Sequence, residues 1–96
     1  MSVNKDMVLV AANGVKARDE EFGLLIVSKT TPALSLNMDS RYVWKQIDGK
    51  RSVLEILRNV EEQFEGEDLE ETTLELLDMF FNIGLVEEVG GEVHGA

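Results

Sequence analysis

The chain is short, acidic and free of cysteine: it has 96 residues, of which 44% are hydrophobic, and a formal net charge of −10. This length predicts one domain, residues 1–96, with a core too modest for a large buried active site. The absence of cysteine excludes disulfides, thiolate-held iron–sulfur clusters and thiol nucleophiles. No apolar run reaches the roughly 18 residues of a membrane span, and the N-terminus lacks a secretory signal, so we expect a cytoplasmic protein without a membrane partner.

The charge is unevenly distributed along the chain. All nine Lys and Arg residues lie at or before Arg58, where seven acidic residues leave a balance of +2, whereas residues 59–96 hold twelve acidic and no basic side chains. A solvated acidic face that keeps the protein soluble explains this pattern most simply. The alternative is an electrostatic preference for a basic partner.

The first third of the chain has the pattern of short strands and tight turns. Asn13-Gly14 is a turn signal before the alternating segment 15–18, and a further turn precedes the apolar, β-branched run 24–27, so we predict a hairpin. Pro32 restricts its neighbour to extended geometry before the alternation resumes at residues 33–36. This segment is expected to be a third strand at the sheet edge.

Helical spacing begins after Asn37, a good N-cap, and predicts a first helix from Met38 to about Ile47. Ser52 followed by Glu55 fits a capping box, in which the hydroxyl accepts an orphan amide proton and the carboxylate reaches back to the cap amide. The second helix then presents an apolar face formed by Val53, Ile56, Leu57, Val60 and Phe64.

Asp68 followed by Glu71 repeats the N-terminal signature and predicts a third helix that runs to about Ile83, with Gly84 in the left-handed position beyond its end. Residues 85–89 suggest a short strand or wing, and residues 92–96 a frayed tail. The expected core face of the third helix comprises Leu69, Thr73, Leu76, Phe80 and Ile83, flanked by Leu74, Leu77 and Phe81.

The predicted order is three strands, three helices and a short strand, an α+β arrangement whose natural closure is a winged helix-turn-helix-like fold with a three-stranded antiparallel sheet. The segment LNMDSRYVWKQIDGKRSVLEILRNVEEQF, followed later by GLV, resembles the PqqD-like family. The resemblance is carried by a strand that ends in Leu-Asn, an aromatic-rich helix, Asp-Gly, a basic residue, Ser-Val and an Ile-containing helix. It covers about residues 8–89.

This resemblance implies a precursor-peptide recognition element, a non-catalytic adaptor that binds the leader of a ribosomally synthesised peptide and presents it to a modifying enzyme, often a radical SAM enzyme. In the family, the leader adds as an extended strand beside the third strand and lies against the third helix. An edge strand offers unpaired amide and carbonyl groups for such an addition. The resemblance leaves open which precursor and enzyme are served, and whether the product is pyrroloquinoline quinone.

The residues expected to bind the peptide lie on the third strand and the third helix. They are Ala33, Leu34, Ser35, Leu36, Asn37, Glu71, Leu74, Asp78 and Phe81. Leu74 and Phe81 would form an apolar wall, with Glu71 and Asp78 as an acidic rim for basic leader residues. In the alternative, Leu74 and Phe81 pack under the N-terminal segment or in a dimer. An exposed third strand also permits strand exchange between protomers.

Two other classes of function are compatible with the predicted fold. Winged helices often bind DNA, but residues 69–83 contain no Lys or Arg to meet phosphates and base edges, so we expect no nucleic-acid partner. A general protein-interaction module is the stronger rival, since it would share the fold and differ only in its ligand.

The residues give little support to catalysis or metal binding. His94 is the only histidine and lies in a Gly-flanked tail, and adjacent acids such as Glu61-Glu62 point in different directions on a helix. No calcium-loop spacing and no His/Cys cluster appears, so we expect no catalytic residue, metal or cofactor. Trp44 and Met38 on the first helix are expected to fill the core.

Overall fold

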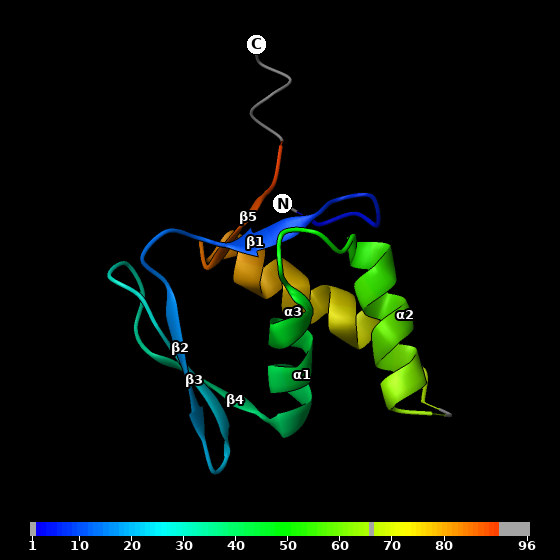
Figure 1. Cartoon of the computed structure of the whole chain (residues 1–96), viewed down its shortest axis with the longest axis horizontal. Helices are drawn as coiled ribbons and strands as arrows, with labels where there is room; N and C mark the ends of the chain where they lie inside the picture. Colours follow the sequence, from blue (N-terminus) through cyan, green and yellow to red (C-terminus); the bar gives the residue numbers. More distant parts are fainter. Residues whose placement is uncertain (1, 66, 91–96) are drawn as a thin grey trace.

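The computed structural model of the chain describes residues 2–65 and 67–90. A three-stranded antiparallel sheet packs chiefly against the first of three helices, and a small two-stranded sheet lies at one end of the helices (Figure 1). The elements in chain order are β1 (Leu9–Ala11), β2 (Lys16–Glu20), β3 (Gly23–Val27), β4 (Leu34–Asn37), α1 (Met38–Gln46), α2 (Val53–Gln63), α3 (Glu70–Asn82) and β5 (Val86–Glu88).

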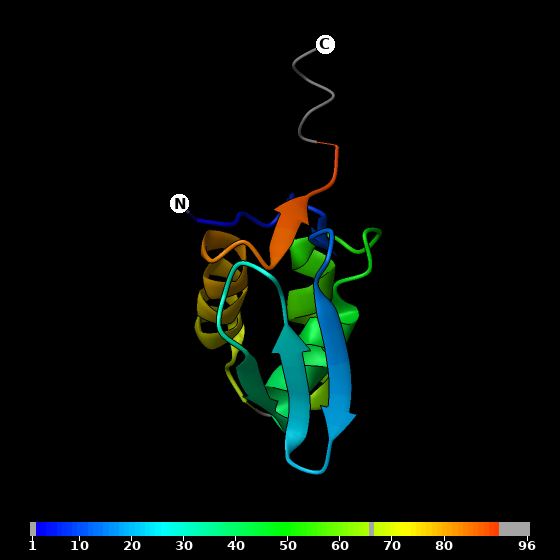
Figure 2. The same cartoon turned by 90° about the vertical axis from the view of Figure 1, so that its left-hand side faces the viewer.

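The larger sheet has the order β2-β3-β4, so the predicted third strand does lie at an edge. Leu24 and Ile26 of β3 and Leu36 of β4 are buried against the helices, because alternate side chains of a strand point to the same face. Figure 2 shows the opposite face of this sheet turned toward the viewer, with α3 standing beyond the β4 edge. The α+β order expected from the sequence is therefore confirmed.

The pairing of the start of β3 with the end of β4 requires glycine at position 23. Gly23 has φ +150°, and a Cβ added there would collide with the carbonyl oxygen of Leu36. Residues other than glycine rarely adopt this backbone conformation. The close approach lets β4 pair with β3 up to Asn37, the N-cap residue that directly precedes α1.

The N-terminal region forms a strand that the sequence did not predict. β1 pairs with β5 in antiparallel register, and its Leu9 side chain is fully buried. The backbone before it joins the start of α2, since the amides of Val53 and Leu54 donate to the carbonyls of Met7 (2.8 Å) and Lys5 (3.1 Å). These carbonyls accept two of the amide protons that the first turn of a helix leaves unpaired.

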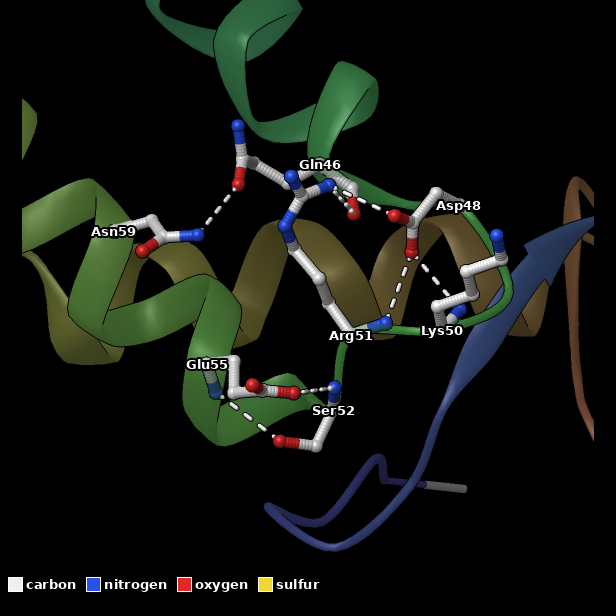
Figure 3. A network of polar contacts seen from close by, with 7 residues as sticks. All are labelled: Gln46, Asp48, Lys50, Arg51, Ser52, Glu55 and Asn59. Atoms are coloured by element: carbon white, nitrogen blue, oxygen red, sulfur yellow. Dashed lines mark hydrogen bonds and ion pairs between the residues drawn. The ribbon is translucent and has the colours of Figure 1, made fainter.

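The predicted caps of the first two helices are confirmed. The Asn37 side chain accepts from the amide of Ser40 (2.8 Å), and Ser52 and Glu55 form both hydrogen bonds of the capping box. Figure 3 shows the linker between these helices, in which Asp48 accepts from two backbone amides and pairs with the Arg51 guanidinium at 2.9 Å. These amides hold the pKa of Asp48 below its ordinary value.

Helix α3 departs from the sequence-based expectation at its start and along its buried face. Asp68 is not its cap: the N-cap residue is Leu69, and no side chain caps the helix. Leu77, expected on the flank, is fully buried, whereas Ile83, expected in the core, is 39% exposed. The buried face is rotated because the N-terminal segment packs on this side of α3, and Leu85 takes the core position beyond the helix end.

Of the two side chains on α1 expected in the core, one is buried. Trp44 packs edge-to-face on Phe80 with ring centroids 5.1 Å apart, as a core residue should. Met38 is 51% exposed, so its expected core role is wrong: it is the first residue of α1 and lines a surface hollow. The expectations for His94 and the tail 92–96 lie outside the described residues.

Candidate functional site

The free edge of β4 is the first part of the candidate site. Within residues 2–65 and 67–90, this strand pairs only with β3. The carbonyl of Leu36 faces β3, and backbone groups alternate in direction along a strand, so the amide and carbonyl of Ser35 point to the open side. Ser35 and Asn37 have exposed side chains, Leu34 is half-buried and Leu36 is buried. Ala33, which precedes the strand, is exposed.

A mainly apolar hollow of about 200 Å³ lies where β4 meets α1; we call it the end hollow. All three helices contribute to its lining, which consists of Asn37, Asp39, Ser40, Val43, Val60, Phe64, Leu69, Thr72, Thr73 and Leu76. An extended peptide that continued the sheet along β4 would therefore have an apolar hollow beside its end.

The two flanks of α3 have different neighbours. On one flank, Asp78 accepts a hydrogen bond from the backbone amide of Val3, and Glu70 pairs with Lys5 at 3.0 Å. Leu74 and Phe81 fall on this same flank by their helical spacing and are half-buried. The N-terminal segment thus occupies the flank that the sequence suggested for the peptide wall.

The other flank of α3 faces the end hollow. Leu76 and Thr72 line the hollow together with Asn37 of β4, and Met79 follows Leu76 on the same side at helical spacing. Glu75 is exposed on the outer side of this flank, whereas Glu71 lines a hollow on the other flank with Glu70 and Leu74. Of the expected site residues on β4 and α3, the structure therefore brings Asn37 to the hollow. It leaves Glu71, Leu74, Asp78 and Phe81 on the opposite flank.

The sequence reasoning did not select Leu76, Val60 or Phe64 for the site. All three stand in the apolar stripes of α2 and α3, and the sequence gives no signal that separates a hollow from a filled core. The end hollow becomes visible only in the structure, where the start of α1 and the end of α2 lie side by side and leave this part of the apolar stripe unfilled.

Acidic side chains predominate around the end hollow. Residues 59–96 carry no Lys or Arg, and Asp39 adds an acid at the hollow itself. The nearest cations on α1 are already engaged: Arg41 and Lys45 pair with Asp19 of β2 at 3.5 and 3.0 Å. The hydrogen bond from Lys45 is the main cause of the lowered pKa of Asp19.

No group of three or more His, Cys, Asp or Glu side chains within residues 2–65 and 67–90 is arranged to hold a metal ion. In the same part of the chain, no helix is long and apolar enough to cross a membrane.

An open strand edge beside an apolar hollow is the arrangement by which a protein receives an extended segment. Comparison with protein families finds a match to coenzyme PQQ synthesis protein D (PqqD) over residues 23–86. The match covers more than half of the chain, so the chain belongs to the PqqD family. Searches of curated proteins and of solved structures found no match.

Proposed function

We propose that this protein is a non-catalytic adaptor that captures the leader of a ribosomally synthesised precursor peptide by strand addition to β4. The captured peptide is presented to a modifying enzyme, with a radical SAM enzyme as the first candidate. The observation that carries this proposal is the free β4 edge beside the end hollow, in a chain of the PqqD family. Biosynthesis of pyrroloquinoline quinone is the pathway that the family name suggests for this partner pair.

Main-chain hydrogen bonds to β4 would supply affinity that does not depend on sequence, with Ser35 as the central residue of the edge. Side-chain recognition is assigned to the end hollow, whose apolar lining from Leu76, Val60 and Phe64 fits a bulky apolar residue. In this proposal, Ala33 to Asn37 form the edge that receives the peptide. The apolar wall is formed by Leu76, and not by Leu74 and Phe81.

The charge of the site favours a leader with basic residues. Glu71 and Glu75 lie on the exposed side of α3, and Asp39 stands at the hollow from α1. A positively charged peptide would be steered toward this end and would form exposed ion pairs there. The same acids oppose nucleic acid, because α3 offers no cation to a phosphate.

The direct test is a backbone-amide NMR titration of the full chain with candidate leader peptides from small open reading frames beside its gene. Shifts clustered on residues 33–37 and on α3 are expected, since these amides border the added strand. A folded protein whose amides respond to none of the candidates would contradict capture by this chain alone. Shifts confined to another surface would favour a general interaction module instead.

A further inference from the structure

A second hollow adjoins the end hollow and has no role in strand addition to β4. It has a volume of about 280 Å³ and lies between α1 and the end of α2. Asp39 and Phe64 line both hollows, so the two hollows are direct neighbours. We call it the side hollow.

The lining of the side hollow is aromatic, polarisable and cationic. The rings of Tyr42 and Phe64 stand edge-to-face with centroids 5.7 Å apart, and Arg41 donates from its guanidinium to the sulfur of Met38 at 3.7 Å. Thioethers, guanidinium groups and ring edges all make favourable contacts with an aromatic ring. These residue types are also the ones enriched in the cores of protein interfaces.

An exposed apolar patch extends the side hollow toward the sheet. Gly23 and Asn37 form the last pair between β3 and β4. Phe22 precedes Gly23 and Met38 follows Asn37, so these two residues flank the same end of the sheet. Within residues 2–65 and 67–90, these two are the most exposed large hydrophobic side chains, at 50% and 51%. Such a patch marks a site of interaction on a surface that is otherwise strongly charged.

The charges around the side hollow balance locally. Arg41 and Lys45 both pair with Asp19, and Asp39 adds a second carboxylate to the lining. An acidic ligand would have to compete with these carboxylates for the two cations. A neutral aromatic group can contact the rings, the sulfur and the face of the guanidinium without breaking the ion pairs.

We propose that the side hollow binds an aromatic side chain of the same peptide that adds to β4, an inference that rests on the proposed function. Residues on one face of an extended strand are spaced by about 7 Å, which suits two hollows that share a wall. The bound segment would carry a bulky apolar residue in the end hollow and an aromatic residue at the next position on the same face, in the side hollow. The side hollow would thus select among leaders that the β4 edge alone accepts.

The test is a selection from a displayed library of random ten-residue peptides with the full chain as bait. Enriched peptides should carry an aromatic residue at a fixed offset of two from a bulky apolar residue. Met38→Asp should weaken binding of these peptides by about tenfold, a loss on the scale of one interface hot spot, and should abolish the aromatic enrichment. Aspartate is well tolerated in the first turn of a helix, so α1 should remain folded.

Val89→Asp is the matched control, because Val89 is a similarly exposed apolar residue, at 43%, beside β5 at the opposite end of the molecule from the start of α1 (Figure 1). It should leave both affinity and selection unchanged. Enriched peptides without an aromatic preference, or with a preference that survives Met38→Asp, would overturn the role of the side hollow while strand addition stands. Failure to enrich any peptide with folded bait would contradict the proposed function itself.

Discussion

Among single residues, Gly23 carries the strictest requirement in the fold. Gly23→Ala should destabilise the protein by on the order of 3 kcal/mol, since the alanine would be strained and its Cβ would meet the β4 backbone. Gly14→Ala is the control: Gly14 also has positive φ, +85°, but no atom lies within 4 Å of the added Cβ. It should cost only about 1 kcal/mol of conformational strain. Urea unfolding of both variants measures the difference, and equal losses would contradict a specific β3–β4 contact.

Asp48 should make stability depend on pH. Its pKa in the folded protein lies below the ordinary 3.8, because the amides of Arg51 and Lys50 donate to the ionised carboxylate. A lowered folded pKa gives stability that is present above 3.8 and is lost as the pH falls through the folded pKa. Asp48→Asn should therefore reduce the unfolding midpoint in urea at pH 7, and the gap from the native chain should narrow below pH 3.8. A gap of constant size would show that the charge of Asp48 is not responsible.

At the scale of the elements, the free edge of β4 can be tested without damage to the core. Ser35→Pro removes an outward-facing amide, and Ser35 has an exposed side chain, so β3 pairing should survive. Peptide affinity should fall at least about tenfold, the equivalent of one lost hydrogen bond in the added strand. Ser35→Ala keeps the amide and should bind normally. Equal peptide affinity of a folded Ser35→Pro variant and the native chain would contradict strand addition at β4.

The elements that the sequence predicted are those whose signals are local. The Asn37 cap and the Ser52 and Glu55 capping box each depend on residues within one helical turn, and the structure has both. The pairing of β1 with β5 joins segments at opposite ends of the chain, and three residues carry too little alternation to reveal it. Local pattern therefore defined the helices, while long-range contacts remained hidden.

One part of the candidate site could be predicted from the sequence and the other could not. The sheet edge followed from the order of the strands along the chain, so β4 was predictable. The choice of flank on α3 was not, because it depends on Val3 and Lys5, which contact Asp78 and Glu70 across most of the chain. Hydrophobic spacing gives the width of an apolar stripe but not which neighbour covers each side.

At the scale of the whole molecule, the uneven charge should govern peptide binding. Glu71→Lys with Glu75→Lys should weaken binding of a basic peptide several-fold at low salt, because two attractive charges on the exposed side of α3 become repulsive. The loss should shrink as salt is added. Glu61→Lys with Glu62→Lys makes the same change in net charge on α2 and serves as the control. Equal effects of the two pairs would indicate only a general field, with no acidic rim at α3.

The pairing of β1 with β5 also determines where the chain can be cut. The PqqD match spans residues 23–86, and a protein trimmed to those limits would lose β1 and β2 and all but the first residue of β5. The cut removes the partner that covers one edge of β3 and removes the buried Leu9 from the core. Because β3 would then present an apolar, β-branched edge, we expect the trimmed chain to self-associate, whereas residues 2–90 stay monodisperse by light scattering. A monodisperse, folded fragment 23–86 would contradict this. Self-association would show that the sequence limits of a family can be narrower than the unit that stays dispersed in water.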